Sequence, residues 1–471
     1  FGLDDTIIEI ENKMFTHRPD CFGQLGVARE ISAILGGVTA PDEGVVDTRF
    51  ENPEWYQASP EFESATGLKL ETFNDAGEKV PRVMFVAMDN VEIKPSPLWL
   101  QCRLVAMGSK AINNVVDATN YVMLMSAQPT HAYDYDKLRG ATIGARMAHD
   151  GEKVPLLNGK VYELDASDIV IADGEGAIGL GGIMGGGNSE VSAETTRIVL
   201  EVATFDMYTV RKTSMRHGVF TDALARFNKG QSPLQNDRVM KCLMNMIQDL
   251  SSAEQASAAV DLGTKDWRKE DSLSGEIDVS VTFINDRLGS DLNAAQIGNM
   301  LRRANFATVA SDDDTGMLHV TAPFWRTDIE LPEDIVEEVG RLYGFDALPR
   351  ELPKRDMTPA PRLARETTMR AVRESLSRAG ANEVLSYSFV HERVLKNAGQ
   401  DASEAFRLSN ALSPDLQFYR LSILPSLLDK VHTNVKLGYD EFVLFEIGKT
   451  HNKTQHATDG EDGLPSEPER V

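Results

Sequence analysis

The sequence predicts an α+β protein built from several domains. Its 471 residues correspond to about three domains at roughly 150 residues each. Residues 82–205 are dominated by short segments that are rich in valine and isoleucine and bounded by glycine, asparagine or aspartate, which is typical of a strand-rich domain. Residues 275–350 alternate strand-like and helix-like patterns, and they therefore predict a small α/β module.

The composition indicates a globular protein without membrane spans. Hydrophobic residues make up 42% of the chain and charged residues 25%, values typical of soluble domains. No apolar run approaches the ~20 residues that a membrane helix needs, and no signal segment opens the chain. Three cysteines far apart in sequence form neither a disulfide framework nor a metal-ligand pair. We therefore expect a reducing, cytoplasmic location.

The net charge of −24 argues against broad wrapping around nucleic acid, because phosphate neutralisation needs clustered lysine and arginine. Local basic positions remain, namely Arg211, Lys212, Arg216 and Lys229. We expect the acidity to serve solubility and a subunit interface.

Residues 1–80 predict a helix–turn segment followed by a connection. A turn at Pro19–Asp20 leads into a helix that ends at Gly36–Gly37, as C-terminal glycines usually do. The spacing puts several apolar side chains on one face of this helix, those of Leu25, Ala28, Ile31 and Leu35. Residues 41–80 are rich in Pro, Glu and Asp and weakly patterned.

Residues 81–230 predict the strand-rich domain, and residues 231–270 predict a helical linker. The expected strands are residues 83–88, 141–148, 161–164, 169–172 and 197–203, and residues 97–107 indicate a short helix. The helix of the linker, residues 234–250, carries methionines at helical spacing. We assign these methionines to core packing.

Residues 271–350 predict the small module, and residues 351–471 predict a last, separate domain. The module should contain strands at 277–282 and 318–322 and helices at 294–304 and 333–343. After a proline-studded linker at 348–361, the last domain should contain a helix at 367–379 and strands at 384–390 and 442–447.

The segment 112–131 carries seven hydrogen-bonding side chains in an otherwise apolar run, where a buried strand should carry few. They are Asn113, Asn114, Asp117, Thr119, Asn120, Gln128 and His131. A buried polar group left unpaired costs roughly 1–3 kcal/mol. These groups therefore either satisfy one another or hold open a pocket for a polar ligand. A hydrogen-bonded turn with one satisfied core histidine is the simpler alternative.

The glycine-rich loop 179–187 does not have the spacing of a phosphate-binding loop. Asn188 stands where a Walker-type loop needs lysine, and Met184 stands where the dinucleotide pattern needs its third glycine. Glycines permit close backbone approach, so the loop is expected to form a pocket wall. A purely structural turn is the alternative.

Glu201 lies within an apolar segment, IVLEVATF, that predicts a largely buried strand. A carboxylate there is costly unless it is paired. The alternation of Leu200 and Val202 around it would also allow Glu201 to face solvent.

An acidic set follows in the small module. Pro332 is expected to open a helix, which puts Asp334, Glu337 and Glu338 on one face. Acids in a first helical turn are favoured by the helix dipole without any metal. With Asp328 upstream, the same set could form an all-oxygen site suited to Mg²⁺.

The ordered motifs of the chain resemble the beta subunit of bacterial phenylalanyl-tRNA synthetase. They are NKMFTHRPDCFGQLGVAREISAILGG, INNVVDATNYVMLMSAQPTH, IGLGGIMGGGNSEV, TTRIVLEVATFD, WRTDIELPEDIVEEVGRLYGF, EVLSYSF, LSNALSPDLQFYRLSILPSLL and FVLFEIG. Their order and spacing are similar to those of the family over nearly the whole chain. The resemblance implies a tRNA editing domain at 81–230, a metal-binding helix within 271–350, and a partial, class II synthetase-like catalytic-fold domain without active-site motifs at 351–471.

The resemblance also implies roles for individual residues. Glu201 matches the glutamate that hydrogen-bonds the phenolic hydroxyl of a misattached tyrosine. Positions near the tRNA 3′ end and the attacking water are matched by His131, Asn120 and Thr119, and His131 would act either as a general base or as a positioning group. The editing pocket would be lined by the loop that contains Gly181, Gly182 and Gly185.

The same resemblance implies partners and cofactors. These are an alpha subunit in an alpha2beta2 heterotetramer, tRNA(Phe), ATP used at the alpha-subunit active site, and Mg²⁺ held by Asp328, Asp334, Glu337 and Glu338. The family's N-terminal oligonucleotide-binding barrel and C-terminal anticodon-binding domain are not visible, and the chain starts at Phe1 without methionine. We therefore expect a piece of a longer subunit.

Two departures from the family pattern leave a rival interpretation open. The segment FTDALARFNKGQSP differs from the usual acid-then-arginine pattern, and MLMSAQ replaces a commoner acidic version after TNY. The rival is a non-catalytic tRNA-binding or scaffold paralogue with an inactive editing pocket.

Overall fold

The computed structural model describes residues 4–36, 39–40, 44–45, 49–310, 316–352, 355–453 and 469–470. It divides into two compact units, Phe1–Glu351 and Leu352–Val471. Within the described ranges, no helix is both long and apolar enough to cross a membrane. The expected helix end at Gly37 lies outside the described residues, as does most of the polar C-terminal stretch.

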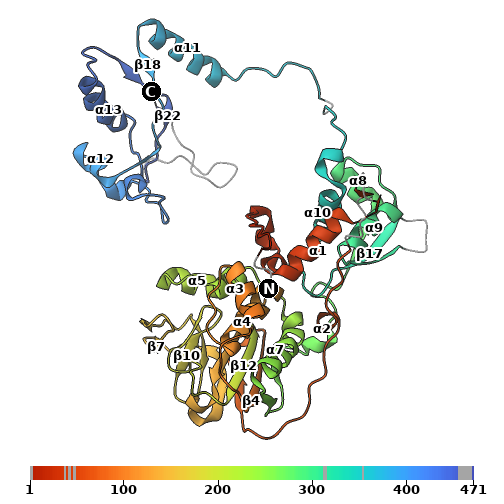
Figure 1. The fold of residues 1–471 in the computed structure, drawn as a ribbon. Coiled ribbons are helices and arrows are strands. Elements are labelled where there is room, and N and C mark those ends of the chain that lie inside the picture. The colour runs from red at the N-terminus through yellow and green to blue at the C-terminus, as the bar shows by residue number, and fades with distance from the viewer. Residues whose placement is uncertain are drawn as a thin grey trace. The chain divides into compact units, whose positions relative to one another are not determined.

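The main body of the first unit contains two sheets that share a core (Figure 1). The first sheet has the order β13-β4-β12-β5, with β14 also paired to β4, and all of its pairs are antiparallel. Its strands are β4 (Arg82–Asp89), β5 (Thr130–Asp134), β12 (Ile198–Thr204), β13 (Glu254–Gln255) and β14 (Val260–Gly263). All five strand segments that the sequence predicted in this region appear as strands.

The second sheet has the order β11-β10-β9-β6-β3, in which β3 and β6 are parallel and the other pairs are antiparallel. Its strands are β3 (Glu71–Asn74), β6 (Thr142–Met147), β9 (Ile169–Ala172), β10 (Ala177–Leu180) and β11 (Met184–Gly185). The hairpin β7 (Lys153–Pro155) and β8 (Val161–Glu163) lies beside it. Short elements complete the body, namely α2 (Glu54–Gln57), α5 (Met207–His217) and α6 (Asp222–Phe227).

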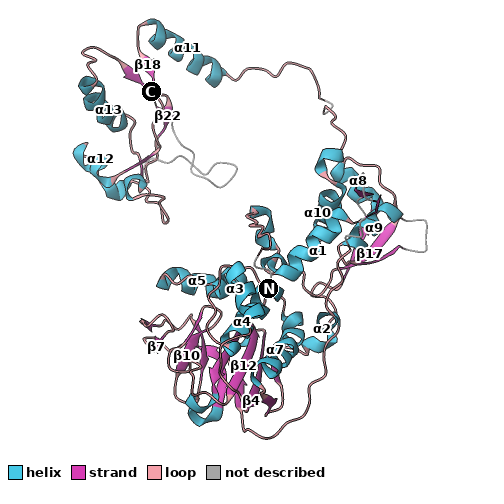
Figure 2. Cartoon of the chain, viewed as in Figure 1, coloured by secondary structure: helices cyan, strands magenta, loops and turns pink. Residues whose placement is uncertain are grey.

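Strands β4 and β12 are buried on both faces because each face meets a different core. Phe85 and Val199 belong to the core shared with the second sheet. Val86 and Leu200, one residue further along, belong to a second core. Helices of this region, drawn in cyan in Figure 2, contribute side chains to the same core. These helices are α3 (Leu98–Ala106), α4 (Asn114–Ser126) and α7 (Asn236–Ser251). Burial on two faces explains why both strands read as continuous apolar runs.

The polar run 112–131 is mostly helical, so the expectation of a buried strand is wrong for most of it. Helix α4 occupies Asn114–Ser126, and only β5 follows as a strand. The Asn113 side chain caps the helix by accepting hydrogen bonds from the Val115 and Val116 amides. Ala127 ends the helix in the left-handed region at φ 65°. Local caps therefore decide the conformation of this run.

The segment 231–270 is not a linker. Helix α7 packs in the core of the first sheet through Met240 and Met244, which confirms the predicted role of the methionines. After the helix, β13 and β14 pair with β4 of the same sheet. The hydrophobic face of α7 needs a partner, and the sheet supplies it, so this segment belongs to the main body.

The module at 271–350 has a three-stranded antiparallel sheet in the order β15-β17-β16. Its strands are β15 (Glu276–Ser280), β16 (Ala307–Ala310) and β17 (Met317–Thr321), and its helices are α8 (Val281–Leu288), α9 (Ala294–Arg303) and α10 (Pro332–Tyr343). The predicted strands and helices are present, whereas α8 and β16 were not predicted. Helices and sheet bury one common core, which includes Ile277, Leu301 and Val339.

Helix α1 (Gln24–Leu35) buries only part of the predicted apolar face, namely Leu25. Ile31 and Leu35 are exposed, whereas Arg29 and Glu30 are buried. Glu30 forms an ion pair with Arg341 of α10. A buried charge is tolerated only when it is paired, and Glu30 is paired with both Arg341 and Arg18.

The second unit has short elements. Its helices are α11 (Ala364–Arg378), α12 (Glu392–Asn397) and α13 (Leu424–Lys436). The predicted strand at 384–390 is instead split between β18 (Asn382–Glu383), which pairs with β21 (Leu444–Phe445), and β19 (Phe389–Val390), which pairs with β20 (Phe418–Tyr419). A last pair joins β22 (Gly448–Lys449) and β23 (Glu469–Arg470), and β1 (Thr39–Ala40) with β2 (Gly44–Val45) forms a similar pair in the first unit.

Candidate functional site

A pocket of about 630 Å³ lies in the main body of the first unit. It is lined by parts of both sheets, by α4 and by the start of α6. Every residue predicted for catalysis or substrate binding lines it, namely Thr119, Asn120, His131, Gly181, Gly182, Gly185 and Glu201. Residues more than 80 positions apart in the sequence thus line one pocket.

The pairing of β5 with β12 brings the two central side chains together. Glu201 of β12 lies directly opposite His131 of β5. Because side chains on a strand alternate between the two faces, Tyr133 lies on the same face as His131. This face carries the core shared with the second sheet, whereas Leu200 and Val202 point to the helices.

Tyr133 was not among the predicted site residues. It lines the pocket, is 2% exposed, and its hydroxyl donates a hydrogen bond of 2.5 Å to Glu201 Oε2. The spacing of two between His131 and Tyr133 would have put both on one face if a strand had been predicted at these positions.

The glycine loop forms one wall of the pocket, as the sequence suggested. A Cβ atom added to Gly185 would lie 2.6 Å from the His131 ring, and one added to Gly181 would lie 2.7 Å from Ile169 Cγ2. Gly182 has φ +71°, a conformation that other residues rarely adopt. Each glycine therefore keeps the loop backbone close to its neighbours.

Glu201 is a buried acid with an unusual proton affinity. It is 7% exposed, and burial raises the pKa of its carboxyl group to about 7, while the hydrogen bond from Tyr133 acts in the opposite direction. Burial also raises the pKa of Tyr133, so the phenol keeps its proton as the donor. Glu201 Oε1 has no hydrogen-bond partner among the described residues, and it is not shielded from solvent.

The His131 side chain is half-buried beside Tyr133. Burial lowers the pKa of its imidazole to about 4. Its ring contacts that of Tyr133 edge to face, with ring centroids 4.5 Å apart. Neither ring nitrogen of His131 has a hydrogen-bond partner in the described part of the chain, so both remain available to a ligand or to water.

The polar side chains of the run 112–131 divide into two groups. Asn114 donates to the carbonyl oxygens of Glu92 and Leu250, and Asp117 accepts from Ser96, so these groups hold the fold together. The residues that line the pocket are Thr119, Asn120 and His131. Thr119 donates to the Val116 carbonyl oxygen within α4, whereas the Asn120 amide has no partner among the described residues.

The four acidic residues predicted to bind magnesium have other partners in the structure. Arg326 pairs with both Asp328 and Glu338, and Arg341 also pairs with Glu338. Asp334 accepts from the backbone amides of Glu330 and Leu331 at the start of α10. The Glu337 side chain is 48% exposed and lies 4.0 Å from His17 Nε2. Asp328 and Glu338 are therefore paired with arginines, whereas Asp334 and Glu337 are not, and magnesium binding by the four acids stays a prediction.

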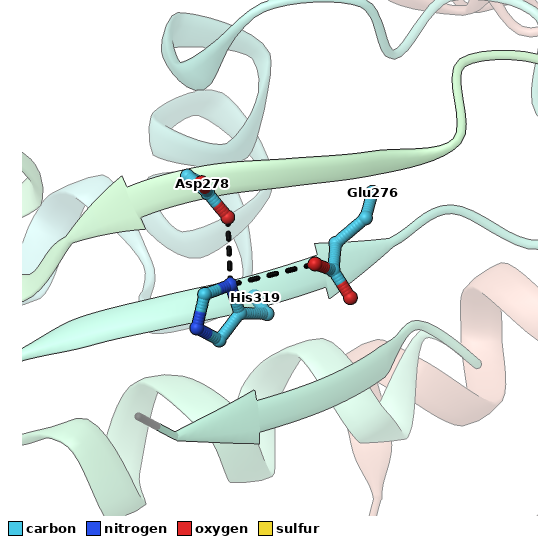
Figure 3. A group of neighbouring side chains, drawn as sticks. All are labelled: Glu276, Asp278 and His319. Atoms are coloured by element: carbon cyan, nitrogen blue, oxygen red, sulfur yellow. Dashed lines mark hydrogen bonds and ion pairs between the residues drawn. The ribbon is translucent and has the colours of Figure 1, made fainter. Parts of the chain in front are cut away.

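A different group of side chains lies close enough to share a metal ion among the described residues, namely Glu276, Asp278 and His319 (Figure 3). His319 Nδ1 lies 2.7 Å from Asp278 Oδ1 and 3.5 Å from Glu276 Oε1. Asp278 and His319 are direct cross-strand partners on the open face of the β15-β17-β16 sheet. Cross-strand pairing accounts for this arrangement without a ligand.

Replacing Glu201 by glutamine should change how stability depends on pH. The folded-state pKa of Glu201 is raised from 4.5 to about 7. The stability that the protonated side chain contributes is therefore fully present below pH 4.5 and is lost as pH rises through 7. The loss at alkaline pH amounts to about 3 kcal/mol. We expect Glu201→Gln to melt higher than wild type at pH 8.5 and close to it at pH 5, by calorimetry. The exposed Glu163→Gln is the control, and a Glu201→Gln effect that does not vary with pH would contradict the assignment.

Three family models match successive parts of the chain. The B3/4 domain matches residues 79–252, the tRNA synthetase B5 domain matches residues 277–345, and the phenylalanyl tRNA synthetase beta chain CLM domain matches residues 348–471. The second and third of these models are named for tRNA synthetases, and the residues that line the pocket fall within the match to the first.

Curated relatives are similar along nearly the whole chain. A phenylalanine–tRNA ligase beta subunit from Solibacter usitatus is 36% identical over 98% of this chain and 57% of its own length. Those from Anaeromyxobacter dehalogenans and Bacillus cereus are 35% and 33% identical, over 98% and 100% of this chain and 55% of each relative. The chain thus spans a little more than half the length of these relatives.

A crystal structure of an N-terminal fragment of the phenylalanyl-tRNA synthetase beta subunit from Pyrococcus horikoshii aligns with 72% of this chain and 90% of that fragment, at 15% identity. The TM-score of 0.35 is too low to establish a shared fold. The ordered domain matches and the relatives lead to one conclusion: the chain belongs to the family of phenylalanine–tRNA ligase beta subunits.

Proposed function

We propose that this chain acts as the beta subunit of a phenylalanyl-tRNA synthetase and that its pocket removes tyrosine from misacylated Tyr-tRNA(Phe). The observation that supports this most is the buried Glu201, which lines the pocket and has one carboxylate oxygen without a partner in the described part of the chain. A hydrophobic pocket rejects an added hydroxyl only about a hundredfold, whereas a site that bonds the hydroxyl discriminates by ~10⁴ to 10⁵. Glu201 provides such a bond to a phenol.

In this proposal His131 and Asn120 position the scissile ester and the attacking water. Both side chains line the pocket and have unused hydrogen-bonding groups among the described residues. With its pKa near 4, His131 is a weak base at neutral pH, since an efficient general base titrates near the working pH. We therefore assign His131 a positioning role, with Thr119 shaping the helix next to it.

The second unit is proposed to act as an interface to an alpha subunit that binds ATP and activates phenylalanine, in a cytoplasmic alpha2beta2 assembly with tRNA(Phe). Arg420 is buried and pairs with Glu446 at 2.8 Å, so it is not free to bind a nucleotide. Helix α13 exposes Leu424, Leu428 and Val435. Exposed apolar stripes of this kind favour a protein partner.

One observation favours the rival function, a tRNA-binding or scaffold protein with an inactive pocket. Glu201 already accepts a hydrogen bond from Tyr133. The buried carboxyl group is thus partly satisfied without any ligand, as it would be in a pocket that binds none. The deacylation experiment below decides between the two functions.

The first test measures release of tyrosine from preloaded Tyr-tRNA(Phe). Glu201→Ala should lower the preference for tyrosyl over phenylalanyl ester by about 10- to 150-fold, because a hydrogen bond to a charged group contributes roughly 1.5–3 kcal/mol. His131→Ala should slow the release of both amino acids. Glu163→Ala and His149→Ala, which are exposed, are matched controls. Unchanged rates in both site variants, or no release by wild type, would favour the scaffold.

The second test concerns amino-acid activation. The purified chain alone should show no phenylalanine-dependent ATP–pyrophosphate exchange, because residues 351–471 carry neither the arginine nor the glycine signature that holds ATP. Adding the cognate alpha subunit should restore exchange and bury an interface well above ~1,600 Å². Exchange by the chain free of alpha subunit would overturn this part of the proposal.

The third test concerns magnesium, which the family resemblance assigns to Asp328, Asp334, Glu337 and Glu338. Because arginines already neutralise Asp328 and Glu338, we expect millimolar Mg²⁺ to leave the melting temperature of the isolated chain unchanged. A saturable rise that Asp334→Asn abolishes, and that the exposed Glu333→Gln retains, would restore the magnesium assignment.

A further inference from the structure

Tyr133 and Glu201 form an unusual pair inside the pocket. Both side chains are buried, at 2% and 7% exposed, and the Tyr133 hydroxyl donates to Glu201 Oε2 at 2.5 Å. A carboxylate has two oxygens and can accept several hydrogen bonds. Oε1 has no partner among the described residues and is not sealed from solvent. The pair therefore leaves one acceptor open toward the pocket.

We propose that Tyr133 is a positioning residue for specificity: its hydroxyl holds Oε2 of Glu201 so that Oε1 stays turned toward the hydroxyl of a tyrosyl ligand. The inference rests on the proposed editing function and adds a residue to it. Tyr133 itself touches neither the ester nor the water in this account. It acts through Glu201.

The strand geometry makes Tyr133 suited to this role. Its ring packs edge to face against His131, with centroids 4.5 Å apart, and its backbone is held in the β5–β12 ladder. The phenol is thus fixed before any ligand arrives. A carboxylate that is already oriented loses less conformational freedom when it binds a ligand, which is the usual advantage of a preorganised site.

The hydrogen bond should also influence the charge of Glu201. A donor to a carboxylate favours the ionised form, and the Tyr133 bond opposes the rise in the Glu201 pKa that burial causes. On β4, the residue paired with Glu201 is the apolar Phe85. The other titratable side chains lining the pocket are His131, Lys110, Glu190, Asp222 and Tyr133 itself. An ionised Glu201 accepts a phenolic proton more strongly than a neutral acid does.

The test replaces Tyr133 by phenylalanine, which removes one hydroxyl and keeps the ring. Tyr135→Phe is the matched control, because the Tyr135 hydroxyl donates to the Lys69 carbonyl oxygen on the exposed surface. The first readout needs no substrate: carboxyl ¹³C NMR, assigned with Glu201→Gln, follows the titration of Glu201. Tyr133→Phe should raise its apparent pKa by about one unit or more, and Tyr135→Phe should leave it unchanged.

The second readout is the pH profile of tyrosine release from Tyr-tRNA(Phe). In Tyr133→Phe the midpoint of this profile should move to higher pH together with the apparent pKa of Glu201. Selection of tyrosine over phenylalanine should fall about tenfold. A second variant guards against misfolding: difluorotyrosine at position 133 keeps the hydroxyl and makes it a stronger donor, so the pKa of Glu201 should fall.

The outcomes separate the two proposals. A wild-type chain that releases no tyrosine would reject the editing function, while the titration would still report on Tyr133. Titration curves of Glu201 that coincide in wild type, Tyr133→Phe and the difluorotyrosine protein would overturn the role of Tyr133. So would a shift of equal size in Tyr135→Phe.

Discussion

The antiparallel pairing of β12 with β5 is the constraint on which the pocket depends. It sets Glu201 opposite His131 and, by alternation, puts Tyr133 on the same face. A slip of one residue would turn the carboxylate toward the helices and Leu200 toward the pocket. The register is held because both faces of β12 are buried, one against the second sheet and the other against α4 and α7.

The same arrangement explains how the protein tolerates a buried acid. The interior around Glu201 disfavours its charge and brings its pKa to about 7. The phenol of Tyr133 compensates in part, and the glycine loop leaves room beside the two side chains, where a Cβ at Gly185 would touch His131. The site therefore combines a poorly solvated carboxylate with open space, which is what selection of a small hydroxyl by one hydrogen bond requires.

Much of this could be predicted from the sequence, but not all. The apolar run around Glu201 predicted its buried strand, and valine- and isoleucine-rich segments predicted the sheet. The conformation of residues 112–131 was missed because caps at Asn113 and Ala127 outweigh the composition of the run. The segment 231–270 was missed because a short strand such as β13 carries almost no pattern of its own.

Contacts between distant residues account for the remaining differences. Two of the four acids predicted to bind magnesium, Asp328 and Glu338, pair with Arg326, and the sequence carries no signal for the pairing of Arg326 with Glu338. Helix α1 likewise carries a buried charge, Glu30, whose partner Arg341 lies on α10, far away in the sequence. Charge pairing across a fold leaves no periodicity in the sequence.

The most direct test of the account is the binding of a non-hydrolysable ligand. The ligand is 3′-tyrosylamino-3′-deoxyadenosine, compared with its phenylalanyl counterpart by calorimetry on the wild-type chain and on Glu201→Gln. The account predicts that wild type binds the tyrosyl ligand at least about tenfold more tightly, as one charge-assisted hydrogen bond would give, and that Glu201→Gln loses most of this preference. Equal affinity of wild type for the two ligands would contradict it.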